Sequence, residues 1–371
     1  METLRTLLCL VLSALTLMRL VVYIQTTQST AVPHFQHPAY LNRTGLVVVM
    51  PVPLTTAPTR PTFMDRISSH FNQTNIQRLQ NVTRKYLSPK RHIINFSDFN
   101  IFVEKCDDLT FTLLNSSERR TCDVVHTPIR THRACAIVGG SGILLSSGCG
   151  AEIDAHDFVI RPNLPPTRLY EKDVGTKNNM TTVNAKVLAE ISKALASNET
   201  VMKKAMISRL VAHPGMILSF PLDVIRLRRY SGPRLAELKT VDNAVRDNNF
   251  PVVVTFAHQS ILANKSLLGS LARVGKNWKL PSTGLATFAL ASTFCDRVSL
   301  YGFHPMRWDK SSRRLVPYHY YNHGKIDNPK HNMLEEFAMF QDLHKRGIIR
   351  HVIGKCNLQA ERKIHGSTSK G

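Results

Sequence analysis

The sequence predicts an α/β fold in which a mainly parallel sheet is flanked by helices. Two observations carry this prediction. First, 43% of the residues are hydrophobic, which is enough to bury one large core or two modest ones. Second, apolar runs of strand length alternate with helical stretches from about Phe102 onward, as is typical of parallel sheets covered by helices. The alternating segments are CAIVG (135–139), DFVIRPN (157–163), VLAEISKALA (187–196), PVVVTF (251–256), GLATFALASTFC (284–295), RVSLYGF (297–303) and LEEFAMFQDLHKRGI (334–348).

The net charge narrows the class of partners. The 371 residues include 48 Lys plus Arg against 26 Asp plus Glu, which gives a formal net charge of +22. A charge of this size favours acidic partners and says little about the fold. Nucleic acid, anionic membranes, sugar nucleotides and acidic glycans are all consistent with it.

The N-terminus has the pattern of a membrane anchor. The apolar segment 7–24 is long enough to cross a bilayer if Arg19 lies near one interface. A cleaved signal peptide is the main alternative, but no small-x-small cleavage site follows the apolar run. We therefore expect a cytoplasmic tail at 1–6, a type II signal-anchor at 7–24, and a lumenal location for the rest of the chain.

The segment after the anchor has the composition of a spacer. Its stretches TTQSTAVPHFQHP and PVPLTTAPTRP are rich in Thr and Pro, which favour extended, glycosylatable chain over packed core. We assign residues 25–100 to a lumenal stem and 101–371 to the folded domain. Eight Asn-x-Ser/Thr sequons agree with a lumenal location. They are at Asn42, Asn72, Asn81, Asn95, Asn115, Asn179, Asn198 and Asn264.

The cysteines favour disulfides over metal binding. Of the seven, Cys9 lies in the anchor, which leaves an even number in an oxidising lumen. No CxxC pair and no zinc-ligand spacing occurs. The remaining six allow many connectivities, so their spacing alone pairs none of them. They are Cys106, Cys122, Cys135, Cys149, Cys295 and Cys356.

A glycine-rich stretch, VGGSGIL (138–144), follows the first apolar run. Glycines after a strand let backbone N–H groups approach an anion, although a tight turn without a ligand fits this motif equally well. The stretch lacks the spacing of a dinucleotide fingerprint or a P-loop. Two other features favour a nucleotide site: Asn163 follows a second predicted strand, and residues Ser282 to Gly284 stand at the start of a predicted helix.

Four segments together resemble the animal sialyltransferases, glycosyltransferase family 29, and within that family the alpha-2,8 branch. The large sialyl motif is similar to CAIVGGSGILLSSGCGAEIDAHDFVIRPNLPPTRLYEKDVGTK, and the small motif to LPSTGLATFALASTFCDRVSLYGFHP. The third motif is similar to YHYY at 318–321, and the very small motif to HNMLEEF from His331. The resemblance extends from about Cys135 to Cys356 and keeps the family's order of motifs.

This resemblance implies a Rossmann-like variant of the GT-A fold for a catalytic domain at 101–371. It also implies two disulfides, Cys135 to Cys295 between the large and small motifs, and Cys149 to Cys356 as in the alpha-2,8 branch. Cys106 and Cys122 are then left to pair with each other. The disulfides formed by the cysteines around the glycine loop would thereby hold a nucleotide site rigid.

The resemblance also implies roles for individual residues. It places His331 as the general base and His319 beside the donor phosphate. A histidine suits proton removal near neutral pH. The implied donor-binding residues are Ser141, Gly142, Asn163, Ser282, Thr283, Gly284, Tyr318 and His319.

The implied function is that of a Golgi alpha-2,8-sialyltransferase, which moves sialic acid from CMP-sialic acid to a sialylated glycolipid or glycoprotein. The donor expels a phosphate, so the enzyme mainly deprotonates an acceptor hydroxyl and stabilises the leaving group. Attack opposite the phosphate inverts the anomeric centre. The chain contains no Asp-x-Asp tripeptide, which agrees with a reaction that needs no metal and no other cofactor.

Structural interpretations compete with these roles. YHYY would also suit a strand with an aromatic face, and Ser282 an ordinary helix cap. For Glu335 and Glu336 we favour the structural interpretation, as charges in the first turn of a helix.

Other functions are weighed beside transfer of one sialic acid. A polysialyltransferase and another sialyl linkage are the alternatives within the family, and a homo-oligomer is left open. A catalytically inactive glycan-binding member is suggested by Gly140, where the branch usually has Asn, and by His304, where it usually has Trp. A nucleic-acid binder fits the charge but not the anchor, the sequons and the cysteines.

Overall fold

A computed structural model describes residues 63–105, 125–220, 233–257, 281–309, 313–322 and 331–356. The expected tail, the anchor at 7–24 and the stem up to residue 62 lie outside these ranges, as do Cys9, Cys106 and Cys122. Within the described ranges, no helix has the length and apolar character that crossing a membrane requires.

An eight-stranded sheet forms the centre of the molecule, in the order β1-β6-β5-β4-β3-β2-β7-β10. Every neighbouring pair is parallel except β1 with β6. The mainly parallel α/β fold that the alternating pattern predicts is confirmed. The strands are β1 (Ile94–Asn95), β2 (His132–Val138), β3 (Phe158–Pro162), β4 (Met180–Val183), β5 (Gly215–Ser219), β6 (Val252–Phe256), β7 (Cys295–Tyr301) and β10 (Ile349–Val352), with a separate ribbon of β8 (Trp308–Asp309) and β9 (Arg314–Leu315).

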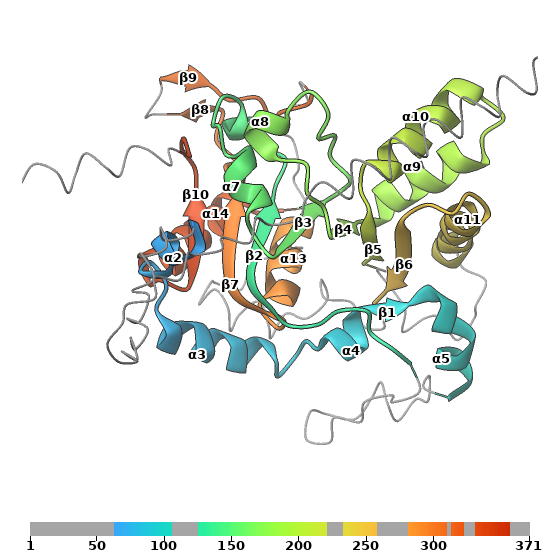
Figure 1. The fold of residues 1–371 in the computed structure, drawn as a ribbon, viewed down its shortest axis with the longest axis horizontal. Helices are drawn as coiled ribbons and strands as arrows, with labels where there is room; N and C mark the ends of the chain where they lie inside the picture. Colours follow the sequence, from blue (N-terminus) through green and yellow to red (C-terminus); the bar gives the residue numbers. More distant parts are fainter. Residues whose placement is uncertain are drawn as a thin grey trace, which may run out of the picture. The chain divides into compact units, whose positions relative to one another are not determined.

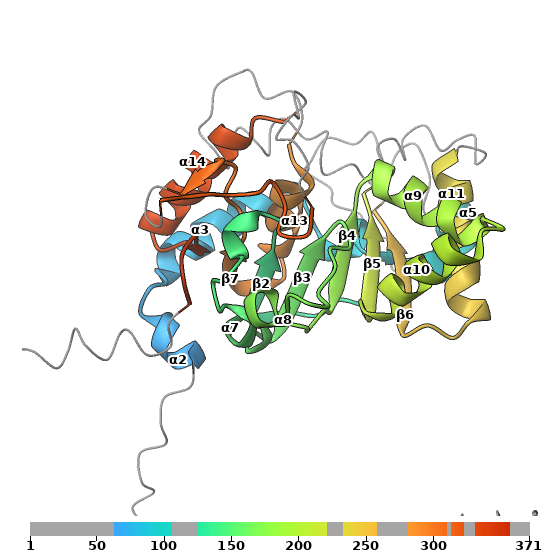
Figure 2. The same ribbon diagram turned by 90° about the horizontal axis from the view of Figure 1, so that it is seen from above.

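Helices cover both faces of the sheet. One face packs against α3, α13 and α14, and the other packs against α7 and α8 over β2, β3 and β7, and against α9 to α11 over β4 to β6. Figures 1 and 2 show α13 and α7 on opposite sides of the strands. The helices are α2 (Phe63–Ser68), α3 (Gln73–Thr83), α4 (Pro89–His92), α5 (Phe99–Lys105), α7 (Gly150–Asp154), α8 (Glu171–Val174), α9 (Ala185–Ala196), α10 (Thr200–Val211), α11 (Pro233–Asp247), α13 (Thr283–Ala291) and α14 (Met333–Lys345), with 3-10 turns η1 (Phe96–Asp98) and η2 (Gly142–Leu144).

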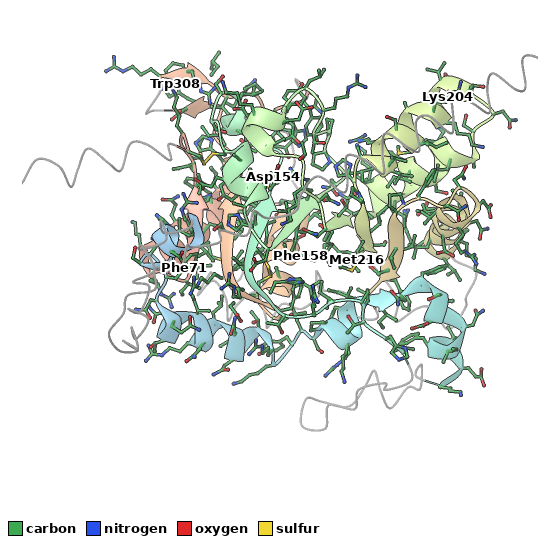
Figure 3. The ribbon with its side chains drawn as sticks, viewed as in Figure 1. Phe71, Asp154, Phe158, Lys204, Met216 and Trp308 are labelled. Carbon is green, nitrogen blue, oxygen red and sulfur yellow. A yellow bond between two sulfur atoms is a disulfide. The ribbon has the colours of Figure 1, made fainter. Side chains whose placement is uncertain are left out.

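Strand β2 shows why the sequence gives a strand covered on both sides. Cys135 and Ile137 face the cluster that contains α13, whereas Ala136 and Val138 face the cluster that contains α7. Apolar side chains on both faces of a strand are typical of parallel sheets. Phe158 and Met216 lie in the first cluster, while Lys204 projects from α10 into solvent (Figure 3).

The folded body begins earlier than the composition predicts. Residues 63–100, assigned to the stem, form short helices and their connections, and the apolar side chains of Ile76 in α3 and Leu87 after it are buried with α13 and α14. Polar contacts fix the same segment, because Gln80 Nε2 donates to the carbonyl of Cys295 at 3.0 Å. The Thr- and Pro-rich composition that suggested a stem ends before residue 63, so the boundary at residue 100 is too late.

The predicted glycosylation sites differ in exposure. Asn72, Asn81 and Asn198 are exposed, whereas Asn95 and Asn179 are half-buried. Asn179 Oδ1 accepts a hydrogen bond from Val159 N at 2.9 Å, and the sequon's Thr181 is fully buried in β4. Asn179 is therefore held in the sheet rather than presented to solvent. Asn42, Asn115 and Asn264 lie outside the described residues.

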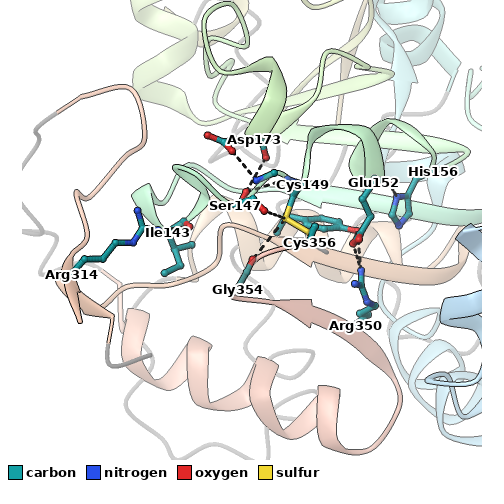
Figure 4. Close-up of a disulfide and its surroundings, with 12 residues drawn as sticks. Ile143, Ser147, Cys149, Glu152, His156, Asp173, Arg314, Arg350, Gly354 and Cys356 are labelled. Carbon is teal, nitrogen blue, oxygen red and sulfur yellow. Dashed lines mark hydrogen bonds and ion pairs between the residues drawn. A yellow bond between two sulfur atoms is a disulfide. The ribbon is translucent and has the colours of Figure 1, made fainter. Parts of the chain in front are cut away.

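Both disulfides implied by the resemblance are present. Cys135 in β2 is bonded to Cys295 in β7, and Cys149 before α7 is bonded to Cys356 after β10. Figure 4 shows a buried polar group next to the second bond, in which Glu152 Oε1 accepts from Arg350 Nη1 at 2.5 Å. The first bond ties β2 to β7, and the second holds the segment after the glycine loop against the segment that follows β10.

Candidate active site

A cleft of about 790 Å³ opens at the carboxyl ends of the parallel strands. Its walls come from the segments that follow β2, β3, β4 and β7, from the start of α13, from 318–322 and from the start of α14. Ligand sites in open α/β sheets occur at this edge. Eight predicted site residues line the cleft: Ser141, Asn163, Ser282, Thr283, Gly284, Tyr318, His319 and His331. The ninth, Gly142, is not among the lining residues.

The glycine loop after β2 is packed closely against two other segments. A Cβ on Gly139 would meet the carbonyl oxygen of Gly302 at 2.6 Å, and one on Gly142 would meet that of Pro317 at 2.6 Å. Gly142 is thus required for packing, and the structure does not place it in contact with the cleft. A Cβ on Gly140 would meet His319 Cδ2 at 2.9 Å, so the imidazole occupies the space that a side chain would need.

Ser141 is also committed to the protein's own contacts. Its Oγ donates to the carbonyl of His304 at 2.8 Å and accepts from Ile143 N at 3.3 Å. Because the single hydroxyl proton is used, Ser141 mainly fixes the loop against the segment after β7. Its predicted contact with a donor is limited to the remaining lone pair of the oxygen.

Asn163 lies at the end of β3 in an uncommon backbone conformation. Its φ is 65° and that of Leu164 is 54°, values that bulky residues rarely adopt. Asn163 N donates to Thr182 O at 2.6 Å, and Asn163 Oδ1 accepts from Asn184 N at 3.3 Å. These bonds fix the side chain and leave its amide N–H₂ group for a ligand.

The start of α13 offers backbone donors to the cleft. Ser282 caps the helix, since its Oγ accepts from Leu285 N at 3.1 Å. The N–H groups of Thr283 and Gly284 occupy the first turn, where a helix has no internal acceptor for them. Gly284 also lets Phe303 approach, because a Cβ there would lie 2.6 Å from Phe303 Cε1. A helix start of this kind suits an anionic oxygen.

Glu336 holds Ser282 from the other side. It lies in the first turn of α14, as predicted, but it is 4% exposed instead of solvated. Its Oε1 accepts from Ser282 N at 2.7 Å and its Oε2 from Ser282 Oγ at 2.5 Å. Burial raises the pKa of Glu336 to about 7, against the opposing effect of the bonds from Ser282. Glu335 and Glu336 both lie in the first turn as predicted. The burial of Glu336 and its contact with Ser282 were not predicted.

His319 is oriented by its neighbours. Its Nδ1 lies 3.1 Å from Asn322 Oδ1, which favours the tautomer with the proton on Nδ1, and its ring is stacked on Tyr321 with centroids 4.9 Å apart. Burial lowers the pKa of His319, and the bond to Asn322 opposes this. Burial also raises the pKa of Tyr318, to which the charge of Glu336 adds. Tyr320 N donates to Gly140 O at 2.8 Å, which ties this segment to the glycine loop.

His331 lies immediately before α14 and lines the same cleft. Asn332 caps the helix, with its side chain accepting from Glu335 N at 3.2 Å. The fold thus brings both predicted histidines to one cavity from two separate segments. Among the described residues, no three His, Cys, Asp or Glu side chains are grouped so as to hold a metal ion.

Several polar or charged lining residues were not predicted as site residues, among them Asn184, Arg209, His304 and Glu336. Asn184 follows β4 as Asn163 follows β3, so the same pattern of a polar residue after an apolar strand could have found it. For Arg209 and Glu336, which lie within helical segments, no local signal distinguishes a cleft residue from a solvated charge.

Comparison with known proteins identifies a matching family and similar relatives. The family model for glycosyltransferase family 29 (sialyltransferase) matches residues 68–348, more than half of the chain. An alpha-N-acetylneuraminide alpha-2,8-sialyltransferase of Xenopus laevis is 31% identical over 246 residues, 64% of this chain and 63% of that protein. Its counterpart in Xenopus tropicalis is 32% identical over 232 residues, 60% of this chain and 61% of that protein. The chain thus matches about three fifths of the length of these relatives.

A crystal structure of a mammalian sialyltransferase aligns with 80% of this chain and 95% of its own, with 19% identity and a TM-score of 0.41. The family match includes the glycine loop, Asn163, the start of α13, both histidines and α3. The chain belongs to glycosyltransferase family 29, the sialyltransferase family.

Proposed function

We propose that this chain is an alpha-2,8-sialyltransferase that transfers sialic acid from CMP-sialic acid to a sialylated glycolipid or glycoprotein. The observation that carries the proposal is the cleft itself. It joins Asn163, the free N–H groups at the start of α13, His319 and His331 in one cavity. The alpha-2,8 linkage is supported by the names of the two Xenopus relatives.

In the proposed reaction, the backbone N–H groups of Thr283 and Gly284 and the imidazole of His319 bind the donor phosphate. Asn163 and Tyr318 contact the nucleotide. These groups stabilise the negative charge that develops on the phosphate as it leaves. Because the Nδ1 proton of His319 is directed at Asn322, a proton on Nε2 would be donated to the phosphate only by the imidazolium form.

His331 is proposed to remove the proton from the acceptor hydroxyl. The hydroxyl oxygen then forms a bond to C2 of the donor's sialic acid, and the bond between C2 and the phosphate oxygen breaks with its electron pair remaining on CMP. Attack from the face opposite the phosphate inverts the configuration in one step. No residue forms a covalent intermediate, and we propose that no metal takes part.

The same proposal includes the setting of the enzyme. Residues 7–24 would anchor it in the Golgi membrane as a single-pass type II protein, with a stem before residue 63 and the catalytic domain in the lumen. The two disulfides that tie β2 to β7 and α7 to the end of β10 agree with an oxidising lumen.

Two observations favour a second candidate, an inactive member that binds glycans. The ring of His319 occupies the space that a side chain at residue 140 would need, and His304 lies in the cleft where the branch usually has Trp. Both features alter the donor side of the cleft. His319 and His331 remain, which is why we favour the enzyme.

An assay of the purified lumenal domain tests the proposal. CMP-sialic acid is supplied with acceptors that end in sialic acid, in galactose or in oligosialic acid, in excess chelator. We expect transfer to the sialylated acceptors and an alpha-2,8 linkage in the product. Donor binding without transfer or donor hydrolysis would favour the glycan-binding member. Loss of activity in chelator that a divalent cation restores would contradict the metal-free reaction.

A further inference from the structure

One end of the cleft has no role in the reaction described above. Helices α9 and α10, which lie side by side next to β4 and β5 (Figure 1), contribute Lys186, Val187, Glu190, Ile191, Met206 and Arg209 to its lining. Three of these residues are apolar, Lys186 and Glu190 form a pair of opposite charges, and Arg209 is the third charged residue. Lys186 Nζ lies 3.9 Å from Glu190 Oε1, so these two charges offset each other.

Arg209 is half-buried and carries a guanidinium with unused donors. Its Nε donates to the carbonyl oxygen of Leu164 at 2.7 Å. Within the described part of the chain, no carboxylate lies within 4.0 Å of it, and its terminal nitrogens make no hydrogen bond to protein. A guanidinium has five N–H donors in a planar fork. One is used in the bond to Leu164, so four remain available to a ligand.

The fork is held in place by a rigid loop. The carbonyls of Leu164, Pro165 and Pro166 each have a side-chain partner, in turn Arg209 Nε at 2.7 Å, His213 Nε2 at 2.7 Å and Tyr320 Oη at 2.8 Å. Leu164 has a φ of 54°, an uncommon backbone conformation that persists only where the surroundings fix it. The contacts of these three side chains with successive carbonyls supply that constraint. The guanidinium is thereby preorganised, which lowers the entropy cost of binding a ligand.

We propose that the free fork of Arg209 binds the carboxylate of a sialic acid unit, and so makes Arg209 a specificity-determining residue of the cleft. The proposal rests on the proposed function, in which both the donor and the acceptor carry such a carboxylate. Arginine suits this group because its fork matches a carboxylate with two parallel hydrogen bonds. The donor phosphate already has partners in the start of α13 and His319, so the carboxylate is the anion left without one.

Binding measurements on separate ligands test the proposal. The ligands are CMP, which has no carboxylate, CMP-sialic acid, and the acceptor pair sialyllactose and lactose. The variants are Arg209→Gln and Arg209→Lys. Tyr320→Phe is the matched control, because it removes a bond to the same loop and leaves the charge of the cleft unchanged.

We expect Arg209→Gln to weaken binding of a carboxylate-bearing ligand by about 10- to 100-fold, the scale of a charge-assisted hydrogen bond, and to leave CMP binding near the wild-type value. Arg209→Lys keeps the charge without the fork and should show a smaller loss. Weakened CMP-sialic acid assigns the fork to the donor, and weakened sialyllactose assigns it to the acceptor.

Two outcomes would overturn the proposal. If Arg209→Gln weakens CMP as much as the sialylated ligands, and Tyr320→Phe does the same, Arg209 acts only by holding the loop that carries Asn163. Unchanged binding of every ligand would also exclude the role. CMP binding by each variant shows that its cleft is folded. Failure of the wild type to transfer sialic acid would instead count against the proposed function, since the binding measurements need no turnover.

Discussion

The buried contact between Glu336 and Ser282 predicts a pH-dependent stability. Glu336→Gln keeps the size of the side chain but removes its titration, and it replaces one acceptor oxygen beside Ser282 Oγ with an N–H₂ group. The folded protein raises the pKa of Glu336 from 4.5 to about 7. The folded state therefore holds this proton more tightly than the unfolded state does.

The sign and the size follow from linkage. The stabilisation is fully present below pH 4.5 and is lost as the pH rises to about 7, because the unfolded chain ionises first. At about 1.4 kcal/mol per pKa unit, the loss is about 3 kcal/mol. For a domain of this size, about 3 kcal/mol corresponds to roughly 6 to 12 °C in Tm.

Thermal unfolding of both proteins at pH 5 and pH 8 measures this effect. Other groups titrate in the same range, so the informative quantity is the change in the wild type minus the change in Glu336→Gln. We expect the wild type to lose more stability than the variant on going to pH 8. Glu335→Gln controls for removing a charge from the same helical turn. Parallel curves for the wild type and Glu336→Gln would refute the reasoning.

Two further predictions concern the donor site, and a third concerns the disulfide between β2 and β7. Lowering the pH should strengthen CMP binding, because burial lowers the pKa of His319 in the free protein and a bound phosphate raises it. His319→Gln should remove this pH dependence of CMP binding, as measured by calorimetry. If the pH dependence persists in the variant, it belongs to another group. Gly140→Ala should displace the His319 ring and weaken CMP binding by about 1 to 3 kcal/mol. Unchanged affinity for CMP would show that the ring moves freely. Cys135→Ala, Cys295→Ala and the double variant should lose the same amount of stability, about 2 to 5 kcal/mol; a double variant much less stable than either single one would contradict the shared bond.

Much of the fold follows from local patterns in the sequence. The apolar run at 135–138 and the run at 158–160 predict strands buried on both faces, and the sheet contains them as β2 and β3. The residues that end these strands lie at one edge of a parallel sheet, so Asn163 could be placed in a cleft before the structure was known. Ser282 to Gly284 could likewise be placed at the start of a helix.

The remaining features depend on contacts between distant segments. The hydroxyl of Ser141 donates its hydrogen bond to the backbone carbonyl of His304, which lies 163 residues away in sequence. Glu336 is likewise bonded to Ser282, 54 residues away. No local sequence pattern around these residues predicts such contacts. The stem boundary fails for a similar reason, because Ile76 and Leu87 look like ordinary apolar residues until α13 and α14 cover them.

The most direct test of the account compares transfer with donor binding in His331→Ala. If His331 is the general base, turnover with CMP-sialic acid and a sialylated acceptor should fall by about two to four orders of magnitude, the usual scale for this type of catalysis, while CMP binding stays close to the wild-type value. An equal loss of CMP affinity would assign His331 to binding, and wild-type turnover in the variant would contradict the proposed mechanism.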